Sequence, residues 1–155
     1  MTLTIDLGNT RAKLTIFDAQ ASILEHHSVA HDDLVEQLRQ LLSMHPEIRR
    51  ICWCAVGEIP AEFPAFLADC RYVVQQLCPT APPSGITLGY RTPATLGADR
   101  LAAVMGAQSL LPHRTVLVID AGTCITFDLL LSDGHYLGGN ISPGLEMRLR
   151  AMYEF

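Results

Sequence analysis

The sequence has no uninterrupted run of about 18 apolar residues, and it does not begin with a charged stretch followed by an apolar one. Those patterns would indicate a membrane span or a secretory signal. Basic residues are also scarce: 11 Lys and Arg stand against 16 Asp and Glu, giving a net charge of −5, and no basic run exceeds two residues. A nucleic-acid or membrane surface site normally needs a concentrated basic patch. We therefore expect a cytoplasmic protein that binds neither nucleic acid nor membranes.

The cysteines are odd in number and lack paired C-x-x-C spacing, which argues against a disulfide framework and against a structural zinc site. They are Cys52, Cys54, Cys70, Cys78 and Cys124. What the chain does have is apolar material: 49% of its residues are hydrophobic and 17% are charged. That composition is typical of a globular protein with a sizeable core. Because the chain also lacks a basic patch, small-molecule chemistry is the class of function that we expect.

One short pattern occurs twice. The apolar run Leu3–Ile5 leads into Asp6-Leu7-Gly8-Asn9-Thr10, and the run Val116–Ile119 leads into Asp120-Ala121-Gly122-Thr123. Each copy is a strand that ends in a carboxylate, followed by a glycine at a tight turn with uncovered N–H groups. Two such turns can clamp an anionic ligand, while the carboxylates hold a cation that neutralises it. The pattern predicts a site for a nucleoside triphosphate and its metal.

The order of elements in the first half indicates an α/β fold. Three strands precede the first helix, whose apolar positions recur at helical spacing until Pro46, and helix-separated strands follow. This order is that of a ribonuclease H-like unit, in which three antiparallel strands lead into a mixed sheet flanked by helices. The predicted strands are 2–7, 11–18, 22–30, 51–56 and 71–76, and the predicted helices are 31–45 and 61–70, the latter broken at Pro64.

A stretch rich in proline and glycine, residues 78–96, predicts a loop or a sheet edge. An apolar helix follows and ends near Pro112, with Asp99 and Arg100 at its N-terminal end. A carboxylate there is explained by capping of free N–H groups. The helix dipole disfavours a cation, so we expect Arg100 to face an anion or a carboxylate partner.

The second copy of the pattern begins too late in the chain to be followed by a complete second unit. We therefore predict a first ribonuclease H-like domain over residues 1–113 and the beginning of a second, truncated one over 114–155. Residues 144–155 predict an amphipathic helix that has no C-cap glycine. The chain is expected to be a fragment.

Four motifs taken together resemble type III pantothenate kinase, a family of the actin-like ATPase superfamily. They span most of the chain, and their combination is far more specific than any one of them. The motifs are Asp6-Leu7-Gly8-Asn9-Thr10 with Lys13, Gly97-Ala98-Asp99-Arg100, Asp120-Ala121-Gly122-Thr123, and Gly138-Gly139-Asn140-Ile141-Ser142-Pro143-Gly144.

The resemblance implies a role for each motif. It implies that the first motif holds the ATP phosphates and, through Asp6, Mg²⁺, and that Thr123 makes a second phosphate contact. Asp120 would bind a monovalent cation, K⁺ or NH₄⁺. The ATP-binding residues would be Asp6, Leu7, Gly8, Asn9, Thr10, Arg11, Ala12, Lys13 and Thr123.

The resemblance also implies a pantothenate site made of Gly97, Ala98, Asp99 and Arg100, with Tyr90 as an additional wall. Asp99 would be the catalytic base. Arg100 would fix the polar tail of the substrate or hold Asp99 in place, and both roles stay open. A homodimer is implied as well, with the helix that begins at Asp99 as a candidate contact. The glycines of the last motif have an alternative role, which is only to turn the chain.

The expected function is transfer of the ATP γ-phosphoryl group to the 4′-hydroxyl of pantothenate, the first step of coenzyme A biosynthesis. One alternative is another actin-like phosphotransferase or phosphatase acting on a sugar, acetate or polyphosphate. A second is a non-catalytic nucleotide-binding regulator resembling an accessory transcription factor, and a third is an inactive fragment of the kinase. Because Asp6, Asp99 and Asp120 are all present, the sequence favours catalysis.

Overall fold

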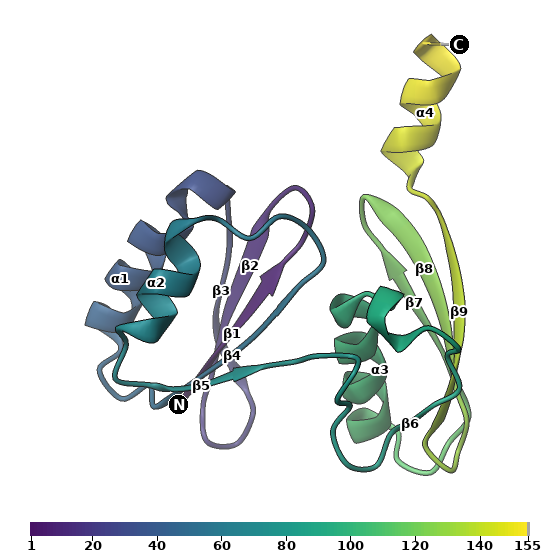
Figure 1. Cartoon of the computed structure of the whole chain (residues 1–155), viewed down its shortest axis with the longest axis horizontal. Coiled ribbons are helices and arrows are strands. Elements are labelled where there is room, and N and C mark those ends of the chain that lie inside the picture. Colours follow the sequence, from purple (N-terminus) through teal and green to yellow (C-terminus); the bar gives the residue numbers. More distant parts are fainter. Residues whose placement is uncertain (155) are drawn as a thin grey trace. The chain divides into compact units, whose positions relative to one another are not determined.

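The computed structural model describes residues 1–154 of the 155-residue chain, which divide into two compact units, one over Met1–Cys78 and one that begins at Pro79 (Figure 1). The units divide earlier than the domain boundary that we predict after residue 113. The reason is that the helix before that boundary packs against the second sheet. The assignment of residues 1–113 and 114–155 to two ribonuclease H-like domains follows the repeated sequence pattern and stays a prediction.

The first unit is built on a five-stranded mixed sheet of order β3-β2-β1-β4-β5. Its first three strands are antiparallel, and β4 and β5 run parallel to β1. This is the ribonuclease H-like order predicted from the sequence, and the prediction is confirmed. The strands are β1 (Thr2–Leu7), β2 (Ala12–Phe17), β3 (Ile23–Val29), β4 (Arg50–Ala55) and β5 (Val73–Gln76).

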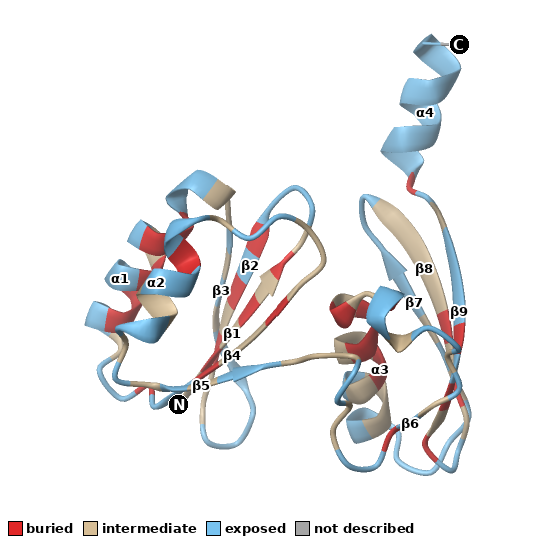
Figure 2. Ribbon diagram, viewed as in Figure 1, coloured by how far each residue is buried: buried red, intermediate tan, exposed pale blue. Residues whose placement is uncertain are grey.

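Helices α1 (Leu34–Met44) and α2 (Glu62–Ala68) lie on the same side of this sheet, and a short 3₁₀ turn, His31–Asp33, precedes α1 (Figure 1). Buried and less buried residues alternate along β1, so one face of this strand lies in the core, and the apolar stripe of α1 covers that face (Figure 2). The predicted apolar face of α1 is therefore confirmed. Its buried residues are Leu34, Val35, Leu38, Leu41 and Leu42.

The helix predicted over 61–70 is not broken at Pro64, and this part of the prediction is wrong. Pro64 is the third residue of α2, which continues to Ala68. The first turn of a helix has N–H groups without intrahelical partners, so the missing N–H of a proline there costs no hydrogen bond. Proline at this position therefore begins the helix instead of interrupting it.

The second unit has a four-stranded sheet of order β6-β9-β8-β7. Strands β7, β8 and β9 are antiparallel neighbours followed by a helix, which repeats the order that opens the first unit. The predicted loop-or-edge segment 78–96 contains a two-residue edge strand and a 3₁₀ turn, Pro93–Thr95. The elements are β6 (Thr87–Leu88), α3 (Ala98–Leu110), β7 (Val116–Ala121), β8 (Cys124–Leu130), β9 (His135–Pro143) and α4 (Leu145–Glu154).

The two helices of this unit differ in burial. Helix α3 contacts β7 and β8, and Leu101 and Val104 are fully buried, so its apolar side packs within its own unit. The expected role of α3 as a dimer contact stays a prediction. Helix α4 has no buried residue in the described part of the chain (Figure 2), and Phe155, the end of the predicted helix, lies outside that part. No helix within residues 1–154 has the length and apolar character needed to cross a membrane.

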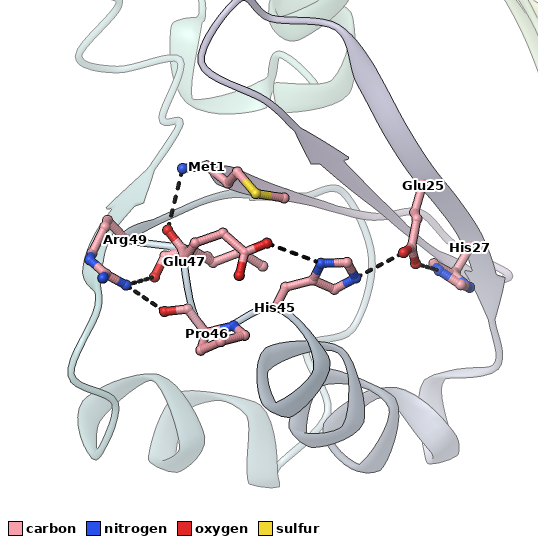
Figure 3. Close-up of polar contacts among 8 residues, drawn as sticks. Met1, Glu25, His27, His45, Pro46, Glu47 and Arg49 are labelled. Atoms are coloured by element: carbon pink, nitrogen blue, oxygen red, sulfur yellow. Dashed lines mark hydrogen bonds and ion pairs between the residues drawn. The ribbon is translucent and has the colours of Figure 1, made fainter.

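A chain of ionisable groups joins edge strand β3 to the end of α1 (Figure 3). The carboxylate of Glu25 pairs with His27 Nε2 at 3.0 Å and with His45 Nε2 at 2.8 Å, and His45 Nδ1 lies 3.5 Å from Glu47. The hydrogen bond from His27, helped by His45, holds the pKa of Glu25 below its usual value of 4.5. One carboxylate thus links two elements that are 20 residues apart in sequence.

Because the pKa of Glu25 is lower in the folded chain than in the unfolded one, its pairing stabilises the fold above the unfolded value and is lost as pH falls through the folded value. We expect the difference in free energy of unfolding between the wild type and Glu25→Gln to be present at neutral pH and to shrink below pH 4.5. Urea denaturation at several pH values measures this difference. A difference that grows on acidification would contradict the prediction.

Candidate active site

The first predicted phosphate turn lies at the carboxyl end of β1. Asp6 is the fifth residue of this strand, and its direct neighbours are Lys13 on β2 and Cys54 on β4. Lys13 Nζ is 3.4 Å from Asp6 Oδ2, and the thiol of Cys54 donates to Oδ1 at 3.7 Å. The Asp6 side chain is 33% exposed. A carboxylate in this position is partnered yet reachable from solvent, as a cation ligand must be.

The turn itself is held by its backbone and by Arg11. Gly8 N donates to Arg11 O at 3.2 Å, and Val56 N, just after β4, donates to Leu7 O at 3.0 Å. The Arg11 guanidinium binds Ser28, through Nε to the hydroxyl at 2.8 Å and through Nη2 to the carbonyl at 2.6 Å. Among the predicted ATP-binding residues, Arg11 therefore has a structural partner of its own on β3.

The second turn repeats this geometry at the end of β7. Asp120 is again the fifth residue of a six-residue strand, it is exposed, and its partner on β8 is Thr126. Gly122 N donates to Cys124 O at 2.9 Å, which closes the turn. Gly144 N donates to Thr123 O at 3.0 Å, so the start of α4 is tied to the same turn. The last glycine motif thus supports the second phosphate turn directly.

The predicted pantothenate motif forms the start of α3. Gly97 is the N-cap, with extended φ and ψ of −62° and 130°, and Ala98 is the first helical residue. Asp99 is half-buried, and its Oδ1 accepts a hydrogen bond from Arg100 N at 2.7 Å. The carboxylate is therefore held against the first turn of the helix, where the helix dipole favours negative charge.

Arg100 points into the second unit and pairs with Asp128 on β8. Its Nε donates to both carboxylate oxygens at 3.1 Å, and its Nη2 donates to Oδ1. Tyr136 on β9 donates its hydroxyl to the same Oδ1 at 2.6 Å. The exposed fractions are 5% for Arg100, 1% for Asp128 and 0% for Tyr136. Removing one partner of such a buried pair costs about 3–5 kcal/mol, because a charge stays behind without a partner.

The surroundings fix the protonation of this cluster. Burial alone would lower the pKa of Arg100, but the hydrogen bonds and the charge of Asp128 outweigh it, and the pKa is raised. Burial, together with the hydrogen bond to Asp128, raises the pKa of the Tyr136 phenol. Arg100 is therefore a permanent cation and Tyr136 a permanent donor at physiological pH.

Tyr90 lies beside this cluster, with its ring against Gly138, the first glycine of the last motif. Gly89 N donates to Tyr136 O at 2.8 Å, continuing the pairing of β6 with β9. Gly138 has a φ of 90°, and a Cβ there would come within 2.8 Å of the Tyr90 ring. A Cβ on Gly139 would overlap the carbonyl oxygen of Phe127, next to Asp128. These glycines do more than turn the chain, because they admit Tyr90 and let β9 approach β8.

The predicted site residues thus fall into two groups, one in each compact unit. The sequence correctly indicated that Arg100 faces a carboxylate, but it did not identify Asp128 or Tyr136. The sequence did hold one signal for Asp128, because this carboxylate interrupts the apolar residues of β8. Side chains alternate between the two faces of a strand, and Asp128 lies on the face that is turned toward α3. Within residues 1–154, no group of three or more His, Cys, Asp and Glu side chains is arranged to hold a metal ion.

Curated relatives match the whole chain. A protein named type III pantothenate kinase from Phocaeicola vulgatus is 41% identical over 155 residues, which are 100% of this chain and 62% of that protein. One of the same name from Christiangramia forsetii is 39% identical over 100% of this chain and 63% of its own length. The chain therefore spans less than two thirds of the length of these relatives.

Solved structures show the fold. A candidate 2-dehydro-3-deoxygalactonokinase from Sinorhizobium meliloti superposes with a TM-score of 0.54 at 18% identity, over 99% of this chain and 56% of that one. The activator of 2-hydroxyisocaproyl-CoA dehydratase from Clostridium difficile, solved with bound ADPNP, gives 0.52 at 15% identity, over 92% and 45%. These likenesses agree with the predicted ribonuclease H-like fold.

The model of one protein family covers nearly every residue of the chain, from 2 to 155. Three of the four motifs found in the sequence lie on the two turns and the helix start described above, and the fourth covers the second half of β9 and Gly144. The chain belongs to the type III pantothenate kinase family.

Proposed function

We propose that the whole protein transfers the γ-phosphoryl group of ATP to the 4′-hydroxyl of pantothenate, giving ADP and 4′-phosphopantothenate. The observation that carries this proposal is the family match over residues 2–155. The placement of Asp6 and Asp120 at equivalent turns, and of Asp99 at a helix start, supports it. Two turns with uncovered N–H groups suit phosphates, and a carboxylate at a helix start suits a hydroxyl donor.

In this reaction the 4′-oxygen of pantothenate forms a bond to the γ-phosphorus as the bond from that phosphorus to the β,γ-bridging oxygen breaks. Asp99 accepts the hydroxyl proton and, before that, aligns the alcohol through a hydrogen bond of about 2.6–3.2 Å. No covalent intermediate on the protein is needed, because the catalytic contribution is alignment and charge stabilisation. Tyr90 would line the side of the pantothenate pocket.

The residues present fit the two cations that the family implies. Asp6 is a partly exposed carboxylate at a phosphate turn, and Mg²⁺ is commonly held by one or two carboxylates together with substrate phosphates and water. When bound, Mg²⁺ supplies neutralisation of phosphate charge. Asp120, exposed beside Thr126, would hold K⁺ or NH₄⁺. Lys13 and Thr123 would contact phosphate oxygens.

The direct test is a coupled assay of ADP formation by the whole protein with pantothenate, MgATP and K⁺. Pantothenate-dependent ADP release is the expected result, and omission of K⁺ is expected to reduce it. A panel with sugars, acetate and polyphosphate tests other acceptors, and preference for one of these would replace pantothenate in the proposal. ATP binding without turnover of any acceptor would favour a regulator.

Asp6→Asn is expected to raise the KM for MgATP about 10- to 100-fold, since a charged contact is worth about 1.5–3 kcal/mol. The KM for pantothenate should change little, because the predicted pantothenate residues belong to the other unit. Steady-state kinetics at several Mg²⁺ concentrations measure both constants. Asp18→Asn, at the exposed β2–β3 turn, is the matched control. An unchanged dependence on MgATP in Asp6→Asn would remove Asp6 from nucleotide binding.

The homodimer implied by the family is also proposed for the whole protein. Sedimentation equilibrium of the whole protein measures the mass in solution. A mass that stays monomeric at micromolar concentration would contradict this part of the proposal.

A further inference from the structure

We propose that Asp128 and Tyr136 are positioning residues that hold Asp99 and Tyr90 in place, and that Arg100 links Asp128 to Asp99. This inference rests on the proposed function for its catalytic consequence. The contacts from which we infer it all lie within the second compact unit, and they can be measured whether or not the protein phosphorylates pantothenate.

The first step is the position of Asp128. It lies within β8, which is an inner strand of the sheet, between Val118 on β7 and Gly139 on β9. Its carboxylate accepts hydrogen bonds from Arg100 and Tyr136 and is 1% exposed. A charge at this depth has no solvent to replace a lost partner, so its geometry is strongly determined.

The second step connects Asp128 to the predicted base. The guanidinium of Arg100 is forked onto Asp128, and the backbone N of the same residue donates to Asp99 Oδ1 at 2.7 Å. Fixing the Arg100 side chain at the sheet therefore fixes the first turn of α3 and the carboxylate attached to it. Arg100 is 5% exposed, and its Nε and Nη2 both donate to Asp128, so this side of the guanidinium is fixed at the sheet.

The third step connects the same cluster to Tyr90. Tyr136 donates its hydroxyl to Asp128, and its carbonyl oxygen accepts from Gly89 N, the residue before Tyr90. The Tyr90 ring then lies over Gly138, where only a glycine leaves room for it. Both predicted walls of the pantothenate pocket, Asp99 and Tyr90, are thus held by one buried carboxylate–phenol pair. A shift of about 1 Å in such groups can cost about 10²-fold in rate.

The structural part can be tested without turnover. In ¹⁵N–¹H NMR spectra, the side-chain Nε–H of Arg100, assigned by its disappearance in Arg100→Lys, is expected to be protected from exchange. Asp128→Asn should raise its exchange rate at least about tenfold, since a charged hydrogen bond is lost. Asp133→Asn, which changes an exposed carboxylate in the β8–β9 turn, is the matched control and should leave the rate unchanged. An unprotected Nε–H in the wild type would overturn the proposal.

The catalytic part uses the whole protein. Asp128→Asn is expected to lower kcat with pantothenate about 10- to 100-fold while the KM for ATP stays within about twofold. In an Arg100→Lys background the same change should add less than about twofold, because Asp128 acts through Arg100. Effects that multiply in the double variant would overturn the link through Arg100.

Tyr136→Phe keeps the ring and removes only the hydroxyl that donates to Asp128. It therefore replaces Asp128→Asn in both measurements if the Asp128→Asn variant does not fold. It should raise Arg100 Nε–H exchange and lower kcat about two- to fivefold, less than Asp128→Asn does, because Asp128 keeps its hydrogen bonds to Arg100. Tyr153→Phe, on exposed α4, is its control. If neither quantity changes in Tyr136→Phe, the proposal is wrong. A wild type that is inactive with pantothenate refutes the proposed function, whereas the exchange measurement still decides the role of the cluster.

Discussion

Asparagine in place of Asp99 is expected to lower kcat for pantothenate phosphorylation about 10²- to 10⁴-fold, the usual contribution of a positioned general base. The substitution keeps the shape of the side chain and an acceptor for Arg100 N, which donates to Asp99 Oδ1 at 2.7 Å. What it removes is the ability to accept the hydroxyl proton. Steady-state assays of the whole protein, with ADP release coupled to a spectroscopic signal, measure the change.

The KM for ATP should stay close to the wild-type value in Asp99→Asn, because Asp99 lies at the start of α3 and belongs to neither phosphate turn. Asp133→Asn, an exposed carboxylate of the same unit, is the control for loss of one negative charge. Thermal unfolding of Asp133→Asn should match the wild type, and Asp99→Asn should lose only about 0.3–1 kcal/mol, the contribution of a negative charge at a helix N-terminus. Full activity of Asp99→Asn would exclude Asp99 as the base and leave its capping role as the explanation of its position.

The first unit could be predicted closely because its signals are local. Leu3, Ile5 and Leu7 alternate with polar or less buried neighbours, and this alternation identifies β1 and its buried face. The apolar positions of α1 recur at helical spacing and end before Pro46 in the same way. Strand and helix bounds in this unit were therefore predicted to within three residues, and the largest difference is at the start of α1, where His31–Asp33 forms a 3₁₀ turn.

What the sequence could not supply are partnerships between distant positions. The pairs Arg100–Asp128 and Glu25–His45 join residues 28 and 20 apart, and only the register of the sheets and the packing of helices bring them together. The sequence indicated that Arg100 needs an anion, since a cation in a first helical turn is disfavoured. It could not select one carboxylate among 16 acidic residues.

Gly139 shows the same limit in a motif that was recognised. The resemblance identified the glycine-rich segment 138–144, but not whether its glycines bind a ligand or shape the chain. In the structure Gly139 faces Phe127 and Asp128 across the β8–β9 ladder, and a Cβ would overlap the Phe127 carbonyl oxygen. The requirement for glycine there follows from the approach of two backbones, which no single-sequence pattern encodes.

Gly139→Ala is therefore expected to destabilise the second unit by about 1–3 kcal/mol or more, because the overlap is with backbone and cannot be relieved by a rotamer change. Strand β9 would have to move away from β8 at Asp128, so hydrogen exchange should rise in peptides covering 124–143. Urea denaturation followed by circular dichroism measures the loss of stability.

The matched control is the same substitution at Gly106, an exposed position within α3 where a Cβ meets no atom within 4 Å. Alanine there should raise the free energy of unfolding by roughly 0.8–1.0 kcal/mol, the difference in helix propensity between the two residues. The two variants thus make the same chemical change in one unit with opposite expected signs. If Gly139→Ala were as stable as the wild type, the close approach of β9 to β8 at Asp128 would be wrong, and with it the geometry that brings Tyr136 and Arg100 to Asp128.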